Sequence, residues 1–286
     1  MKILRYFIVI CLIATSCNQK NDNKSEEEEA RSTASKTPIL IEEKRRKKIE
    51  ENQKIYGNHK EHSFKIALDT AKKYLSLEKF KKEFYHEIPE SDYGIFISIN
   101  IDRPFNRSQK HLTIKRGFDD WTHVYIFKIE KHNLIPVLKH GQEGHSFIED
   151  TIFDVNGDKL KDFLIHSFSS AGCCPRNLYT VYLNKGTNGE FISEKEFMNP
   201  TFYPKEKKIL GMTYGHIGAV SLYKFKWKGT EIDTIEYIYK DTNSNNKYPY
   251  FKTKKEVWLE DTGTIVPLEK IPKEYIGIGN DWFDIN

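Results

Sequence analysis

The chain has little cysteine, and the placement of its four cysteines excludes most thiol chemistry. Cys11 and Cys17 lie near the N-terminus, so the rest of the 286-residue chain holds only the neighbours Cys173 and Cys174. There is no C-x-x-C motif and no second cysteine pair, which excludes a thioredoxin-type redox site and a cysteine-rich zinc site. Two adjacent thiols form a strained vicinal disulfide in an oxidising compartment or stay reduced when buried, and both states are open for this pair.

Signatures of catalysis are also missing. The sequence has no G-x-S-x-G, no H-E-x-x-H and no glycine-rich phosphate loop. A catalytic cysteine would need a nearby histidine base, and the candidates His166 and His216 stand in no hydrolase signature. His140, Glu143 and His145 have a spacing compatible with metal ligands, although a polar, glycine-containing loop explains them as well. We therefore expect a binding protein rather than an enzyme.

Neither sign of charge dominates the sequence. It has 45 Lys and Arg against 41 Asp and Glu, a formal net charge of +4. Removal of residues 1–16 would take away Lys2 and Arg5 and leave 43 basic groups against 41 acidic ones. We therefore expect no nucleic-acid partner, since such proteins concentrate positive charge on one face.

Long apolar runs are absent except at residues 7–13, a stretch too short to span a bilayer. This run follows Lys2 and Arg5 and precedes small residues, the order found in secretory signals. With Cys17 directly after, the segment resembles a bacterial lipoprotein signal, which implies that residues 1–16 are removed and that Cys17 carries the lipid. Ala14 departs from the usual aliphatic residue, so an ordinary secretory signal is the alternative. Either signal exports the protein.

Residues 17–60 are polar and charged, and such sequence buries too little apolar surface to offset its chain entropy. We expect a disordered tether that holds the following domain off the outer membrane, on its periplasmic or its surface face. Residues 39–51, rich in Glu, Lys and Arg, are read as an exposed helix or more of the tether. The acidic run at residues 26–29 resembles the export signal of Bacteroidetes surface lipoproteins.

Residues 61–90 place apolar side chains near helical spacing with lysines between them, which predicts an amphipathic helix. Residues 91–286 change to short runs of Val, Ile, Tyr, Phe and Thr separated by turn residues. We expect strands at residues 94–101, 122–130, 134–139, 146–154, 162–169, 178–184, 207–214, 219–228, 230–240, 251–259 and 264–267. So many short strands predict a mainly β domain, either an antiparallel sandwich or a propeller-like stack of sheets.

The most informative segment is the loop at residues 154–162, called the acidic loop below, where oxygen-bearing side chains alternate at positions 154, 156 and 158 and return at 162. Hard divalent cations take oxygen ligands, and this alternation supplies them from one continuous turn. We predict a Ca²⁺ site formed by the side chains of Asp154, Asn156, Asp158 and Asp162 and the backbone carbonyl of Leu160.

The flanks of the acidic loop are β-prone, so we expect it to connect two strands. An EF-hand would have glycine where Lys159 stands and glutamate where Ile165 stands, which argues against a helix–loop–helix sensor. The pattern Asp-x-Asn-x-Asp-x-x-x-Asp before an apolar strand resembles the calcium loop of FG-GAP/VCBS-type β-proteins, with Lys159 as the one departure. The alternative is a solvated turn rich in Asp and Asn that binds no ion.

The segment 169–177 holds a glycine, both adjacent cysteines and a proline, and we expect a rigid turn that presents Arg176 and Asn177. A purely structural corner is the equal alternative. Residues 146–240 resemble periplasmic lipoproteins whose calcium-loop β-domain inhibits lysozyme-like peptidoglycan hydrolases. The resemblance implies such a hydrolase as protein partner, with Arg176 as the first candidate for its acidic cleft and His216 after it.

A competing interpretation is a surface module that binds glycan or another envelope protein without inhibiting it. Aromatic residues are 13% of the chain, and Tyr248, Tyr250, Phe251, Trp258 and Trp282 are candidates to stack on sugar rings or to fill sheet cores. A third interpretation is that calcium is structural and the domain serves envelope assembly.

Overall fold

The computed structural model describes residues 24–89, 94–118, 121–169, 176–186, 190–192, 194–214, 220–242, 247–257, 263–279 and 283. The chain divides into two units, Met1–Asn58 and His59–Asn286. No helix among the described residues is both long and apolar enough to cross a membrane.

The described part is one long helix followed by strands, with two short 3-10 helices at Pro204–Glu206 and Lys273–Tyr275. The helix is α1 (Lys24–Lys72). The strands are β1 (Phe80–Glu87), β2 (Gly94–Asp102), β3 (His111–Phe118), β4 (Trp121–Glu130), β5 (Asn133–Glu143), β6 (His145–Phe153), β7 (Asp162–Ser169), β8 (Arg176–Tyr182), β9 (Lys195–Met198), β10 (Pro200–Tyr203), β11 (Lys208–Met212), β12 (Ser221–Lys228), β13 (Glu231–Lys240), β14 (Tyr250–Thr253) and β15 (Val266–Leu268).

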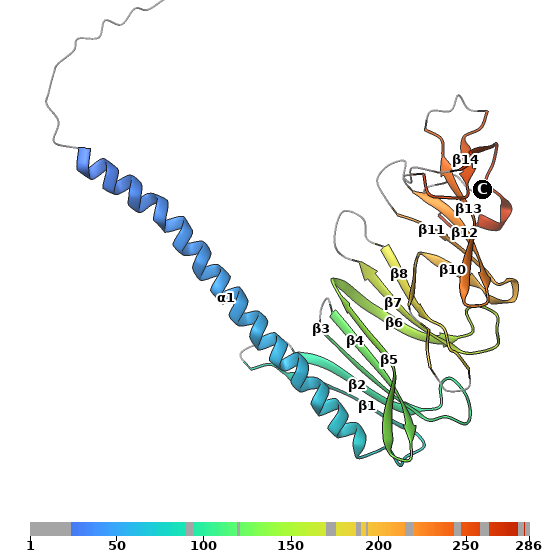
Figure 1. The fold of residues 1–286 in the computed structure, drawn as a ribbon, viewed down its shortest axis with the longest axis horizontal. Helices are drawn as coiled ribbons and strands as arrows, with labels where there is room; N and C mark the ends of the chain where they lie inside the picture. Colours follow the sequence, from blue (N-terminus) through green and yellow to red (C-terminus); the bar gives the residue numbers. More distant parts are fainter. Residues whose placement is uncertain are drawn as a thin grey trace, which may run out of the picture. The chain divides into compact units, whose positions relative to one another are not determined.

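The strands form three antiparallel sheets, in each of which neighbours in sequence are neighbours in space (Figure 1). The first sheet holds β1–β5, the second β6–β9 and the third β10–β15. Tight turns make this possible: Lys131 and His132 turn β4 into β5 with positive φ angles, and Gly229 does so between β12 and β13. The prediction of a mainly β, antiparallel domain after an N-terminal helix is confirmed.

The second sheet lies between the other two, and the burial pattern of β7 records this. Phe163 and Ile165 pack with first-sheet residues such as Val124, whereas Leu164 packs with third-sheet residues such as Trp227. Because successive side chains of a strand point to opposite faces, a strand in the middle layer is apolar on both. This explains why Phe163, Leu164 and Ile165 of β7 are consecutive apolar residues instead of alternating with polar ones.

Residues 59–72 of α1 cover the outer face of the first sheet. Phe64 stacks on Tyr125 of β4 with ring centroids 4.3 Å apart, and Ala67 is fully buried. The guanidinium of Arg116 on β3 is 1% exposed and donates to the hydroxyl of Ser63 and to the carbonyl of Lys60. Small residues on the helix therefore allow close approach, and the helix supplies one hydroxyl and one backbone carbonyl as acceptors for the buried cation.

The prediction of a helix over residues 61–90 is wrong for the second half of that range. α1 ends at Lys72, and Phe80–Glu87 is the strand β1. Phe80 and Phe84 are four residues apart, a separation that keeps two side chains on one face in a helix and in a strand alike. Their spacing therefore did not distinguish the two structures.

The segment expected as a tether, residues 17–60, is helical from Lys24 onward in the structure. Glu, Lys, Arg and Ala favour helices even without an apolar face, and the tether prediction weighed only the missing apolar surface. Three strands were also not expected, namely β3, β9 and β10.

Candidate functional site

The acidic loop connects β6 to β7, as expected for a strand–loop–strand unit. Phe153 and Asp162 face each other in the register of the two strands, so the loop closes directly on the sheet. Ile165, at the position of the closing glutamate of an EF-hand, is fully buried in the core. The two-strand setting is therefore confirmed, and Ile165 belongs to the packing of the domain.

Asp154 holds the loop in its tight curve. Its Oδ1 accepts hydrogen bonds from the backbone N–H of Gly157 at 2.6 Å and of Asp158 at 3.2 Å, and its Oδ2 accepts one from Lys159 at 2.8 Å. Gly157 and Lys159 have φ angles of +75° and +73°. The carboxylate thus stabilises two residues in the left-handed conformation. At Lys159 this conformation costs about 1–2 kcal/mol, because its Cβ is crowded.

Asp162 closes the loop from the other end and is fully buried. Its Oδ2 accepts the backbone N–H of Val155 at 2.8 Å, and its Oδ1 accepts that of Asn184 at 2.9 Å. Burial raises the pKa of Asp162 to about 6, and the nearby charges of Asp158 and Asp154 act in the same direction. Three carboxyl groups are therefore held near one another in this loop.

The loop also ties the second sheet to the third. Asn156 donates to the carbonyl of Gly229 in the β12–β13 turn at 3.3 Å. A Cβ at Gly157 would overlap the carbonyl oxygen of Pro204, so the loop lies directly against the 3-10 helix after β10. Sequence reasoning missed Gly229 and Asn184 as loop neighbours, because they lie 73 and 22 residues from their loop partners and no local pattern marks such contacts.

The residues present fit an oxygen-loving cation by their chemistry. The loop supplies three carboxylates, one amide oxygen and backbone carbonyls, the donor set that Ca²⁺ prefers. In the side-chain conformations present, no described group of three His, Cys, Asp or Glu residues surrounds an ion position, and the carboxylates accept backbone N–H groups instead. To bind an ion, these carboxylates would therefore have to share their oxygens between the ion and the N–H groups, or change their side-chain conformation.

The segment 169–177, called the recognition turn below, follows the other end of β7, and its residues 170–175 lie outside the described residues. Arg176 pairs with Ser169 at the start of β8, and its buried Nε donates no hydrogen bond within the described part of the chain. Asn177 is engaged inside the protein: its Oδ1 lies 2.8 Å from the Nε2 of His166, and its Nδ2 donates to Asn199 at 3.3 Å. Arg176 is thus the better placed of the two for a partner.

Other predicted site residues lie outside the described residues. These are Cys17, Cys173, Cys174, His216, Trp258 and Trp282.

The structure does not gather His140, Glu143 and His145 into one site. The Nδ1 of His140 lies 2.8 Å from the hydroxyl of Tyr182 in the core, and Glu143 pairs with Lys60 of α1 at 2.5 Å. His140 and Glu143 thus have separate partners, and their spacing is explained by the strand β5 that carries both.

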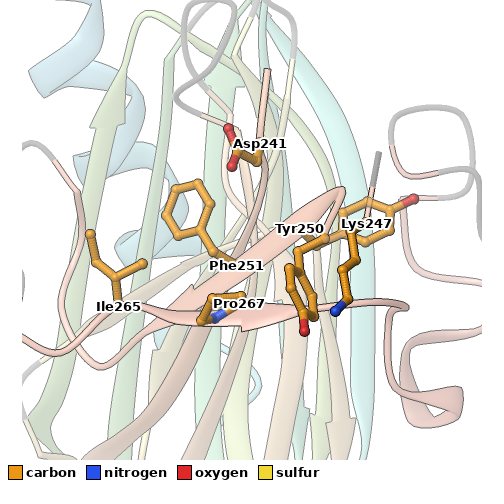
Figure 2. A pocket seen from close by; sticks show the side chains of 7 residues that line it. Asp241, Lys247, Tyr250, Phe251, Ile265 and Pro267 are labelled. Carbon is orange, nitrogen blue, oxygen red and sulfur yellow. The ribbon is translucent and has the colours of Figure 1, made fainter. Parts of the chain in front are cut away.

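A pocket of about 360 Å³ lies beside β14 and β15, and Figure 2 shows its lining side chains. We call it the tyrosine pocket; it is lined by Asp241, Lys247, Tyr248, Tyr250, Phe251, Ile265 and Pro267. Tyr248 is 37% exposed, whereas Tyr250 is buried. The exposed large aromatics of the described residues, Tyr85, Phe153 and Tyr248, stand on or beside three different sheets and form no row.

No family model, no curated protein and no solved structure matches the chain. The resemblance to FG-GAP/VCBS-type calcium loops therefore stays a prediction from ten residues.

Proposed function

We propose that this chain is an exported, lipid-anchored binding protein whose β-domain is stabilised by Ca²⁺ and holds another envelope protein. The observation that carries the proposal is the acidic loop, in which Asp154, Asp158 and Asp162 lie on one tight turn between paired strands. An ion there would offset the mutual repulsion of the carboxylates. Calcium is preferred because every donor in the loop is oxygen.

The calcium ion would stabilise the contact between the second sheet and the third. The loop contacts the third sheet through Asn156 and Gly157, so fixing its shape also fixes how the second sheet meets the third. We assign it a structural role, since the loop lies against the protein on this side.

Calcium binding is tested by calorimetry and thermal melting with and without chelator. Asp158 is exposed, so Asp158→Asn removes the negative charge of one ligand with little effect on packing. Calcium at about 100 times its Kd is expected to add about 2.7 kcal/mol to the stability of the wild type. Asp158→Asn should lose most of this gain, and the exposed helix residue Asp69 serves as the control through Asp69→Asn. Identical melting temperatures in calcium and in chelator would contradict calcium binding.

The partner surface we propose is the β7–β8 end, with Arg176 as its anchor. The half-buried Arg176 suits a carboxylate-lined cleft, because the terminal nitrogens of a guanidinium form two parallel hydrogen bonds with a carboxylate. Lysozyme-like peptidoglycan hydrolases have such clefts, and we name them as the first partner class. The protein on this view inhibits a hydrolase and has no catalytic activity of its own.

Inhibition is tested by titrating the protein into muramidase and glycosidase assays and by a pull-down from envelope extract. Arg176→Ala is expected to abolish inhibition, while the exposed Arg107→Ala leaves it unchanged. Absence of inhibition together with failure to capture any hydrolase at about micromolar concentration, a Kd worth about 8 kcal/mol, would contradict the proposed partner.

The tyrosine pocket favours a second candidate function, the binding of glycan. An aromatic ring beside charged groups is a common sugar platform, and Tyr248 is flanked by Lys247, whose Nζ lies 5.2 Å from the ring centroid. Soluble peptidoglycan fragments should then bind the wild type and not Tyr248→Ala. Tyr85→Ala is the control, because Tyr85 is exposed on another sheet.

A further inference from the structure

Three histidines gather where the end of α1 meets the edge strand β1. His59 and His62 lie about one turn apart on the helix, and His86 lies on the strand. The Nδ1 of His59 is 3.2 Å from the Nε2 of His86, and the ring centroids of His62 and His86 are 5.3 Å apart. Three imidazoles from two elements therefore share one small region.

The nitrogens of His59 and His86 are a hydrogen-bond distance apart, and a shared metal ion would hold them at nearly the same separation. For metal–nitrogen bonds of about 2.0–2.1 Å in a tetrahedron, two ligand nitrogens lie roughly 3.3 Å apart. In the conformations present, no three His, Cys, Asp or Glu side chains of the described residues surround an ion position. His62 is exposed, so its ring turns toward the pair without repacking the core.

We propose that His59, His62 and His86 bind a divalent transition metal ion, with Zn²⁺ as the first choice, that clips the helix to the edge of the first sheet. Imidazole suits zinc, copper and nickel, whereas the oxygen donors of the acidic loop suit calcium, so the two sites take different ions. Three protein ligands leave a fourth coordination position, which water or a partner's side chain would fill.

The test is calorimetric titration of Zn²⁺ into the purified protein with calcium in excess, so that the acidic loop does not compete. The wild type is expected to show one tight site. His62→Ala and His86→Ala are each expected to weaken it by about 10–100-fold or more, since loss of groups that merely orient a ligand already costs that much. His132→Asn is the control, because His132 is exposed in the β4–β5 turn and Asn tolerates its φ of +72°.

A second measurement keeps the outcome clear if a variant is less stable. Zn²⁺ should raise the melting temperature of the wild type and of His132→Asn, and should not raise that of His62→Ala. Co²⁺ in place of Zn²⁺ should give the visible absorption of a tetrahedral site in the wild type and not in His62→Ala. Equal Zn²⁺ affinity in the wild type and His62→Ala, or no binding by the wild type, would overturn the proposal.

Discussion

At the scale of single residues, the backbone conformation of the acidic loop carries much of its specificity. Gly157 and Lys159 both have positive φ, yet their surroundings differ. Gly157 faces the Pro204 carbonyl, whereas Lys159 is exposed. The glycine is therefore required by conformation and by space together, and the lysine position by conformation alone.

Gly157→Ala should destabilise the protein more than the same change at Gly144. Both glycines have φ of +75°, so both alanines suffer the left-handed penalty of about 1 kcal/mol. At Gly157 the added Cβ also overlaps Pro204, which adds about 1–3 kcal/mol, while at Gly144 nothing lies within 4 Å. Urea unfolding of the two variants measures the difference, and equal losses would mean that the loop moves freely from the third sheet.

Acid should destabilise the protein through His111. Burial lowers the pKa of His111 from 6.5 to about 4. Between these values the unfolded chain binds more protons than the folded one, so stability is complete above 6.5 and is lost as pH falls toward 4. At about 1.4 kcal/mol per pKa unit, the full effect is on the order of 3 kcal/mol.

The measurement is urea unfolding near pH 7 and near pH 5, where wild type should lose more stability than His111→Leu. A residual slope is expected in the variant, because burial also lowers the pKa of His123 to about 4. Parallel losses in wild type and His111→Leu would exclude His111 as the source.

At the scale of elements, residues 59–72 of α1 act as part of the β-domain. They bury Phe64 against Tyr125 and provide both acceptors named for Arg116. Without them a buried guanidinium and the isoleucines of β2 would meet water on one face.

A fragment that begins at residue 59 should fold, whereas one that begins at residue 73 should not, or should expose apolar surface. The second fragment loses residues 59–72, the helical segment that covers the first sheet. Arg116 then loses its acceptors on the helix, and an unpaired buried cation costs several kcal/mol. Circular dichroism and dye binding distinguish the two. Matching melting temperatures would show that this helical segment adds nothing to the domain.

At the scale of the whole molecule, three meander sheets in sequence order make the fold modular along the chain. The middle sheet carries both the acidic loop and the start of the recognition turn, at the two ends of β7. One central strand, packed on both faces, therefore connects the loop with the start of the turn.

Membrane attachment is proposed to depend on Cys17 alone. Cys17→Ser should move the protein from the membrane pellet to the soluble envelope fraction, because the chain then has no thiol at the site of lipid attachment. Cys11→Ser, within the proposed signal, should leave attachment unchanged. Retention of Cys17→Ser in the pellet after high-salt washing would contradict the lipid anchor.

Much of the β architecture was predictable, since hydrophobic alternation and turn residues are local signals. The expected strand at 162–169 matches β7, and the expected strands at 219–228 and 230–240 are present as the paired β12 and β13. β3 was not expected because Lys115 and Arg116 interrupt its apolar pattern. Their charges are met by Asp150 on the next sheet and by the helix, contacts that no local pattern contains.

The sequence by itself determined the strand class, the turns and the oxygen donors of the acidic loop, because each depends on residues close together in the chain. Only the tertiary structure decided that β7 lies in the middle layer, that the loop joins two sheets, and that His59, His62 and His86 meet. Those arrangements arise from packing between residues tens of positions apart, where apolar pattern sets the buried face of a strand but not its neighbour.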